Sequence, residues 1–229
     1  MVGFRLPDDF LIGTANSAFQ SEGAWDRDGK SESIMEYYGR KYQGTFGPHV
    51  TMEEGKAKGS VPFGNDENAK GCEFYDNYEA YIEDMAKTGQ NTYRLSLSWS
   101  RIIPTGYGEV NPKGIEFYNK VIDKLIACNI TPFVDLYHWD LPQWVLDRGG
   151  AICDEFVDWF VGFAETCFRE FGDKVKYWST TNEPNCSIFG GYYDKCDDVA
   201  GRFPPFEKDL RKGFLANHHM ILAHYRCVK

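Results

Sequence analysis

Hydrophobic and polar positions along the chain change repeatedly between a period of two and a period of about 3.6 residues. Residues 93–99 alternate strictly, with an apolar face of tyrosine, leucine and tryptophan and a polar face of Arg94 and two serines. Residues 115–126 instead repeat their apolar side chains at helical spacing, after an Asn-Pro pair typical of a helix start. Strands and helices are therefore expected to follow one another along the chain.

The whole chain repeats this succession about four times. The predicted strands are 10–15, which is apolar enough to be buried, 93–99, 132–137 and the run that ends in Tyr177-Trp178-Ser179-Thr180-Thr181. The predicted helices are 73–88, 111–126, 156–168 and a last one that contains Phe214, His218, Leu222 and Tyr225. Such alternation predicts an α/β fold of parallel strands joined by right-handed crossovers. The polar, glycine-dotted segment 26–72 lacks clear periodicity and is interpreted as a long loop insertion over the site.

Composition and charge exclude several classes of protein. The net charge of −9 argues against a nucleic-acid surface, which needs clustered lysine and arginine. No apolar run approaches the roughly 18 residues of a membrane span, and the first residues lack the regions of a signal peptide. The seven cysteines form no C-x-x-C pair, which favours free thiols in a reducing compartment. A cytoplasmic protein without nucleic-acid or membrane partners is expected.

The strongest candidate for chemistry is Asn182-Glu183-Pro184, which follows the fourth predicted strand. Proline cannot donate to a sheet ladder, so Glu183 is expected at the very end of that strand. Parallel α/β barrels and sheets place their chemistry at this edge. The alternative is that Asn182-Glu183-Pro184 only forms a polar connection between the strand and the following loop.

Two earlier strands carry further candidates. Gln20 follows the first strand, and its amide can both donate to and accept from sugar hydroxyls, unless it is an ordinary surface amide. Arg94 either points into a barrel, where it would neutralise a catalytic carboxylate, or faces solvent from an edge strand. The sequence leaves both alternatives open.

The third strand leads into His138 and Trp139, followed by Trp144. Aromatic rings at the end of a strand can bind the apolar faces of sugars, although both tryptophans could equally be core rings. Near the C-terminus, three histidines and Cys227 match no zinc spacing, and an ordinary helix explains them better. We therefore predict neither a metal nor a cofactor.

Several of these motifs occur together and in order: Phe-Leu-Ile-Gly-Thr-Ala at 10–15, Phe-Gln-Ser-Glu-Gly-Ala at 19–24, Tyr-Arg-Leu-Ser-Leu-Ser-Trp-Ser-Arg-Ile at 93–102, Tyr-His-Trp-Asp-Leu-Pro at 137–142 and Trp-Ser-Thr-Thr-Asn-Glu-Pro at 178–184. Together they resemble the N-terminal half of a glycoside hydrolase family 1 enzyme, the family of β-glucosidases and 6-phospho-β-glycosidases. The resemblance runs from about Phe10 to the end of the chain.

The resemblance implies a fold and a mechanism. Residues 1–229 would form the N-terminal half, about four βα units, of a (β/α)8 barrel that hydrolyses β-glycosides with retention. In that mechanism two carboxyl groups about 5–5.5 Å apart flank the scissile bond. By matching position, Glu183 would be the general acid and base, and Asn182 would hold the sugar 2-hydroxyl.

The resemblance also implies roles for the remaining candidates. Gln20, His138 and Trp139 would form the subsite of the non-reducing sugar, and Arg94 would support the nucleophile carboxylate. The substrate would be a β-glucoside or a related small saccharide. The His-Trp-Asp-Leu-Pro motif favours unphosphorylated glucosides as substrates, with 6-phospho-β-glucosides as the alternative.

The chain also departs from the family pattern. The family's nucleophile lies in a Thr-Glu-Asn-Gly segment that these 229 residues do not contain, and a complete barrel needs roughly 250 residues. Ala151 stands where relatives usually have tryptophan, and Asp135 where they usually have threonine. A carboxylate at position 135 would be costly unless paired, with Arg94 a plausible partner.

These departures predict that the isolated chain is inactive. They also predict that it associates with a complementary C-terminal half-barrel or with itself, as a fragment or one piece of a split enzyme. The alternatives are a non-catalytic half-barrel that binds sugar or a partner, and a metal-binding or redox protein that uses the cysteines and histidines. A reading frame that continues beyond Lys229 into a Thr-Glu-Asn-Gly segment would favour the enzyme.

Overall fold

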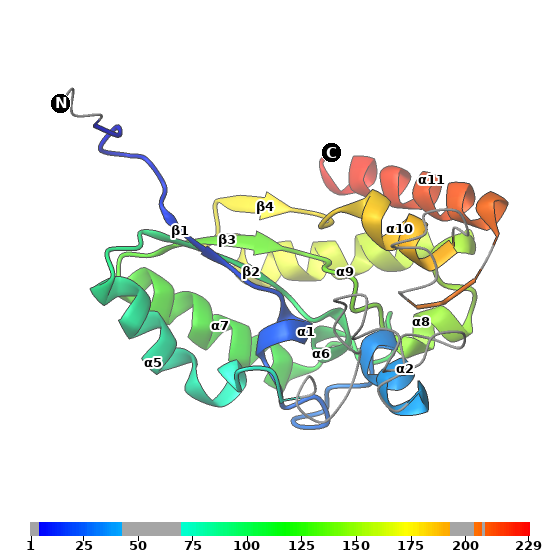
Figure 1. Ribbon diagram of the computed structural model, residues 1–229, viewed down its shortest axis with the longest axis horizontal. Helices are drawn as coiled ribbons and strands as arrows, with labels where there is room; N and C mark the ends of the chain where they lie inside the picture. The colour runs from blue at the N-terminus through cyan, green and yellow to red at the C-terminus, as the bar shows by residue number, and fades with distance from the viewer. Residues whose placement is uncertain (1–4, 43–69, 193–203, 208) are drawn as a thin grey trace, which may run out of the picture.

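Four parallel strands form one sheet, and they lie in it in the order in which they occur in the chain (Figure 1). The computed structural model describes residues 5–42, 70–192, 204–207 and 209–229. The strands are β1 (Gly13–Ala15), β2 (Thr92–Ser96), β3 (Thr131–Asp135) and β4 (Tyr177–Ser179). Every neighbouring pair is parallel, which confirms the predicted topology. The register aligns Ser96 with Asp135 and Asp135 with Ser179, so the carboxyl ends of the strands form one edge, here called the C-terminal rim.

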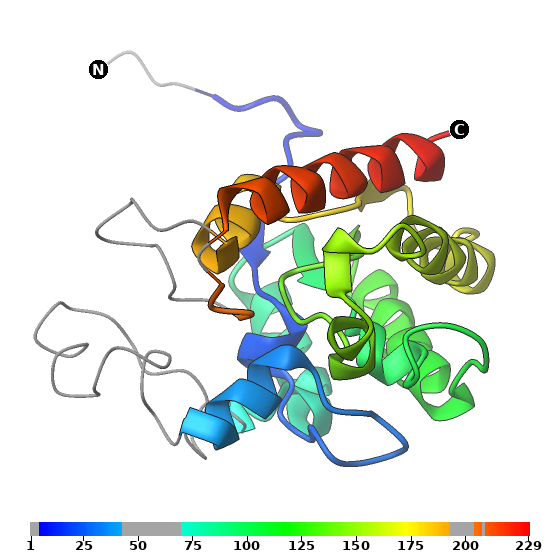
Figure 2. The same ribbon diagram turned by 90° about the vertical axis from the view of Figure 1, so that its right-hand side faces the viewer.

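Helices lie in the connections between the strands and also after the last strand. They are α1 (Ala18–Ser21), α2 (Ile34–Tyr42), α5 (Phe74–Lys87), α6 (Trp99–Ile102), α7 (Pro112–Ala127), α8 (Gln143–Asp147), α9 (Phe156–Phe171), α10 (Pro184–Tyr192) and α11 (Leu210–Cys227), with a 3-10 turn at Gly150–Ile152. The long helices α5, α7 and α9 lie along one face of the sheet (Figure 1). Helix α11 runs beside α9 and α10 (Figure 2). In the described part of the chain, no helix is long and apolar enough to cross a membrane.

Local sequence explains why the central helices form where they do. Helix α7 begins after Asn111, whose side chain accepts a hydrogen bond from the Lys113 backbone N–H at 3.2 Å, and Pro112 occupies its first turn. One stripe of α7 is buried against the sheet. Helix α9 buries a phenylalanine-rich stripe, in which Phe163 stacks on the ring of Trp99 with centroids 5.0 Å apart. The core therefore lies between the sheet and these helices.

The first strand differs from its prediction. Residues 10–15 were expected to be a buried strand, but β1 covers only Gly13–Ala15 and is exposed, and Phe10 and Ile12 before it are 48% and 50% exposed. The reason is position in the sheet: β1 is an edge strand and pairs only with β2 among the described residues. An apolar run favours burial, but residues 10–15 lie at the edge of the sheet, where no described element covers them.

Two strand ends and the segment 26–72 also differ from their predictions. Strand β2 ends at Ser96 and Trp99 begins helix α6, so the predicted strand 93–99 is too long. Strand β4 ends at Ser179, so Glu183 lies beyond the strand rather than at its very end. The cause is Pro184, which opens helix α10, while the carbonyl of Glu183 accepts from the N–H groups of the first turn. Within the segment 26–72, helix α2 was not anticipated, and residues 43–69 lie outside the described residues.

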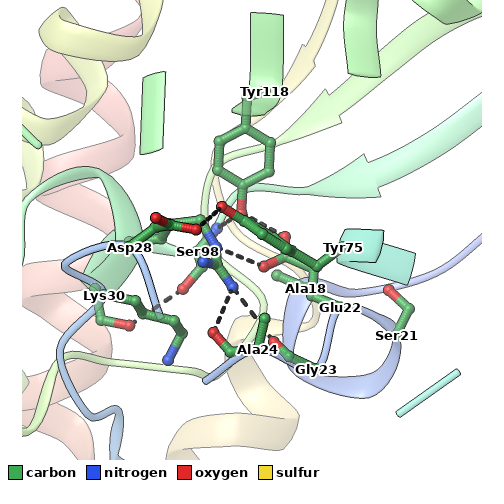
Figure 3. A network of polar contacts seen from close by, with 12 residues as sticks. Ala18, Ser21, Glu22, Gly23, Ala24, Asp28, Lys30, Tyr75, Ser98 and Tyr118 are labelled. Carbon is green, nitrogen blue, oxygen red and sulfur yellow. Dashed lines mark hydrogen bonds and ion pairs between the residues drawn. The ribbon is translucent and has the colours of Figure 1, made fainter. Parts of the chain in front are cut away.

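A buried polar network connects the residue after α1 to helices α6 and α7 (Figure 3). Glu22, just after α1, accepts from Arg101 Nε at 2.9 Å and from the hydroxyl of Tyr118 at 2.5 Å. The Tyr118 oxygen also accepts from the backbone N–H of Ser98 at 2.7 Å. The side chains of Arg101 and Glu22 are only 0% and 5% exposed, and the guanidinium lies over the ring of Tyr75. This network fixes the segment that carries Gln20.

Candidate active site

A buried carboxylate joins three strands at the C-terminal rim. Asp135 is fully buried at the end of β3. Its Oδ2 accepts from Arg94 Nη2 of β2 at 2.8 Å, and its Oδ1 accepts from Ser179 Oγ of β4 at 2.6 Å. The pairing with Arg94 confirms the partner expected for this carboxylate, and it excludes the alternative of an arginine that faces solvent alone. Opposite charge at this distance offsets the cost of burying Asp135.

Arg94 also connects to the segment before Glu183. The same Nη2 donates to Asn182 Oδ1 at 2.9 Å, and Asn182 Nδ2 lies 3.1 Å from His138 Nε2. The backbone of Asn182 is held as well, because its N–H donates to the carbonyl of Tyr137 and its carbonyl accepts from Trp139 Nε1, both at 2.9 Å. Arg94, Asp135, His138, Ser179 and Asn182 are called the site network below.

Two residues of this rim have a left-handed backbone. Trp139 has a φ of 76° and Glu183 a φ of 43°. For residues other than glycine this conformation costs about 1–3 kcal/mol each, and it persists where the surroundings fix it, often at functional sites. Here the hydrogen bond between Trp139 and Asn182 ties the two segments together. The strain therefore lies at the position where function was predicted.

Glu183 lies next to Asn182 and before Pro184, at the beginning of α10. It is exposed, whereas Asn182 is half-buried in the site network. The backbone therefore places Glu183 just beyond the carboxyl end of β4, directly after a residue of the site network.

Gln20 reaches the same rim from the first βα unit. The N–H of Ala18, at the start of α1, donates to Ser96 Oγ at 2.8 Å and so sets α1 on the end of β2. Gln20 is exposed, and its Oε1 accepts from Ser17 Oγ at 2.8 Å. In the described part of the chain its hydrogen bond runs to Ser17 rather than to the site network.

Sequence reasoning did not single out Ser179, although it is part of the site network. Its signal was available: Ser179 is the small polar residue two positions before Thr181, on a strand whose other residues are bulky and aromatic. Trp144, weighed as a sugar platform or a core ring, packs edge-on against Trp159 with centroids 5.3 Å apart. Trp144 thus belongs to the helical layer and not to the site.

The C-terminal histidines make contacts of their own. His219 Nδ1 lies 2.8 Å from the carbonyl of Ala151, and His224 Nδ1 lies 2.8 Å from Thr180 Oγ1. Across the described ranges, no group of three or more histidine, cysteine, aspartate or glutamate side chains could hold a metal ion. Six of the seven cysteines have free thiols, and Cys196 lies outside the described residues.

A second buried carboxyl group follows Trp139. Burial, and after it the negative charge of Glu36, raise the pKa of Asp140 to about 8. Glu36 itself is paired with Lys30 at 3.0 Å, and the positive charge of that lysine keeps the pKa of Glu36 low despite its burial. Asp140 Oδ1 has no hydrogen-bond partner among the described residues. Asp140 is therefore neutral in the folded chain at pH 7.

Known proteins resemble this chain over almost its whole length. Residues 3–229 match the family described as Glycosyl hydrolase family 1. The chain is 41% identical to the 6-phospho-beta-glucosidase GmuD of Bacillus subtilis (strain 168), over 99% of this chain and 44% of that relative. It is 39% identical to Beta-glucosidase 11 of Arabidopsis thaliana, over 96% and 40%.

A solved structure gives the same result for the fold. A beta-glucosidase from Thermotoga maritima in complex with glucoimidazole superposes with a TM-score of 0.83 at 35% identity, over 97% of this chain and 45% of that one. The chain thus spans less than half the length of these relatives. Its four parallel βα units are the N-terminal half of a (β/α)8 barrel, as the motifs predicted.

Proposed function

The chain belongs to glycosyl hydrolase family 1, and we propose that it supplies the acid and base half of a retaining β-glycosidase. The observation that carries this proposal is the site network, which holds Asn182 beside Glu183 on the rim where such barrels bind substrate. A half-barrel contributes one of the two carboxyl groups that the reaction needs. The other, the nucleophile, would come from a complementary C-terminal half.

In the first step Glu183 protonates the glycosidic oxygen while the nucleophile carboxylate attacks the anomeric carbon. The bond to the leaving group breaks, the alcohol departs with the proton, and a covalent glycosyl-enzyme forms. In the second step the Glu183 carboxylate takes a proton from water, whose oxygen attacks the anomeric carbon and releases the nucleophile. Glu183 ends protonated, as it began.

The site network would position the sugar for this reaction. Asn182 would bind the 2-hydroxyl, a contact that strengthens in the transition state. His138, Trp139 and Gln20 would form the subsite of the non-reducing sugar. His138 and Gln20 would make hydrogen bonds to its hydroxyl groups, and Trp139 would contact it with its ring face. Arg94 would hold the nucleophile carboxylate ionised and oriented.

For the substrate, we propose an unphosphorylated β-glucoside, with a 6-phospho-β-glucoside as the alternative. One relative is named a beta-glucosidase and another a 6-phospho-beta-glucosidase, at nearly equal identity. Initial rates of the reconstituted barrel on the two aryl glucosides decide between them. A higher kcat/KM on the plain glucoside supports the proposal, and the reverse order replaces it by the alternative.

The test of the function is reconstitution. The 229-residue chain alone is expected to leave an aryl β-glucoside intact, and co-expression with a C-terminal half from a family member is expected to restore hydrolysis. Glu183→Gln removes the transferable proton at nearly constant shape, so it should lower the restored rate by about 10²–10⁴-fold.

Glu116→Gln is the matched control, since Glu116 is 62% exposed and pairs with Lys120 on helix α7. This control is expected to keep the full rate. Strong hydrolysis by the chain alone that survives Glu183→Gln would refute the assignment of roles.

A further inference from the structure

The protonation of His138 can be read from the site network. Asn182 Oδ1 accepts from Arg94 Nη2, so the amide nitrogen of Asn182 is the atom that faces His138 Nε2 at 3.1 Å. An amide nitrogen only donates, and therefore Nε2 must carry the lone pair. A neutral imidazole with its lone pair on Nε2 carries its proton on Nδ1.

Asp135 lies on the other side of the same ring. His138 Nδ1 is 3.3 Å from Asp135 Oδ2, and the side chains are 17% and 1% exposed. This contact is electrostatic rather than a hydrogen bond, because Nδ1 has no hydrogen-bond partner among the described residues. A negative charge at this position favours a proton on Nδ1. The Asp135 carboxylate therefore acts on His138 twice, directly through Nδ1 and indirectly through Arg94 and Asn182.

The carboxylate is held in place from both neighbouring strands. Its side chain is bonded to Arg94 and Ser179, and its backbone carbonyl accepts from the N–H of Leu97 at 2.9 Å. A terminal guanidinium nitrogen has two hydrogens, and Arg94 Nη2 uses one on Asp135 and one on Asn182. Loss of the carboxylate would free the guanidinium to turn.

We infer that Asp135 is a positioning residue that fixes His138 in the Nδ1–H tautomer and thereby presents Nε2 as a hydrogen-bond acceptor. A hydroxyl group that replaces the Asn182 amide at Nε2 would donate its hydrogen to His138. The released amide could then bind a neighbouring hydroxyl, so the pair would recognise two adjacent hydroxyl groups of a pyranose. This consequence for a sugar rests on the proposed function, whereas the tautomer of the free chain does not.

The test is the tautomer itself, measured on the 229-residue chain by long-range proton–nitrogen correlation of ¹⁵N-labelled histidines at about pH 8, where imidazole is neutral. The His138 signals are identified by their loss in His138→Gln. The wild type is expected to show a protonated Nδ1 and an unprotonated Nε2. Asp135→Asn removes the negative charge beside Nδ1, so the two nitrogen signals should converge as both tautomers become populated.

Asp123→Asn is the matched control, because it removes the same charge from a side chain that is 58% exposed and paired with Lys174. It is expected to leave the His138 signals unchanged. The signals of His219, whose Nδ1 faces the Ala151 carbonyl, report in every sample whether the fold is intact. If Asp135→Asn does not fold, Asp135→Thr, uncharged and smaller, is expected to give the same convergence.

Two results would overturn the inference. One is a wild-type His138 protonated on Nε2, which contradicts the network directly and stands even if every Asp135 variant unfolds. The other is an Nδ1–H tautomer that persists in a folded Asp135→Asn or Asp135→Thr chain. That result would mean that Asp135 does not determine the tautomer of His138. Neither result depends on hydrolysis, so failure here is distinct from failure of the proposed enzyme.

Discussion

At the residue scale, two buried carboxyl groups near the C-terminal rim are stabilised in different ways. Asp135 has a cationic partner in Arg94 and a donor in Ser179, which offset the cost of burying its side chain. Asp140 lies among other acidic groups, and its pKa is raised to about 8 by burial and by Glu36. The first group serves the site network, while the second ties the stability of the fold to pH.

Asp140 predicts a loss of stability as pH rises. Its pKa in the folded chain lies above the ordinary 3.8, so the folded state holds a proton that the unfolded state releases. Its contribution is fully present below about pH 4 and is lost as the pH rises through about 8. Asp140→Asn should therefore flatten the fall in unfolding free energy between pH 5 and about 8.5, measured by urea denaturation.

The same variant should be more stable than the wild type at the upper end of this range. Asp123→Asn is a suitable control, since it changes the same group at an exposed position. An unchanged slope in Asp140→Asn would mean that Asp140 ionises in the folded chain as it does in solution.

At the scale of elements, the period of the sequence predicted β2, β3 and the long helices, because each of these buries one face against the core. Helix α7 was expected at 111–126 and occurs at Pro112–Ala127. The periodicity could not predict the residue at which each element ends near the site. Strand β4 stops at Ser179, and Glu183 adopts a left-handed backbone before α10, because local hydrogen bonds and Pro184 decide there rather than periodicity.

The sequence predicted the residues of the candidate site better than their connections. Arg94 and Asp135 could be paired in advance, since a buried charge requires a partner. The link from Arg94 through Asn182 to His138 required the register of three strands and the orientation of a loop, which no pattern of a single strand contains. Ser179 was missed although its own strand carried a signal, the single small polar residue among bulky aromatic ones.

The buried pair of Arg101 and Glu22 predicts a large loss of stability on substitution. Arg101→Met leaves the buried Glu22 without its cationic partner, with Tyr118 as its remaining side-chain donor among the described residues, and should cost about 3–5 kcal/mol of unfolding free energy. Lys113→Met removes an exposed pair with Asp28 and should cost no more than about 1 kcal/mol. Chemical denaturation of the two variants compares them, and equal losses would contradict the structural role of the network.

At the scale of the whole molecule, both ends of the sheet leave apolar surface uncovered. Phe10 and Ile12 are exposed before β1, and Phe214, Ile221 and Tyr225 are 53–59% exposed on α11. A strand edge and an apolar helix face of this kind favour association. The half-barrel fold explains their position, because β1 and the β4–α11 unit are its two ends.

We therefore predict that the chain alone self-associates, and that a complementary half-barrel replaces this contact. Sedimentation velocity should show species larger than a monomer, and Ile221→Glu should shift them toward the monomer by placing charge on the exposed face of α11. Glu116→Gln, on α7, serves as the control. A stable, compact monomer of the unaltered chain would count against the prediction.

The claim on which the account depends is that Glu183 gives a proton to the departing sugar oxygen, and leaving-group dependence tests it most directly. In the reconstituted barrel, the glycosylation rate is measured for an alkyl β-glucoside, whose leaving group requires a proton, and for a dinitrophenyl β-glucoside, whose leaving group does not. Glu183→Gln is predicted to slow the alkyl substrate by about 10²–10⁴-fold and the dinitrophenyl substrate far less. Equal slowing of the two substrates, or none, would contradict the role of Glu183 as the general acid.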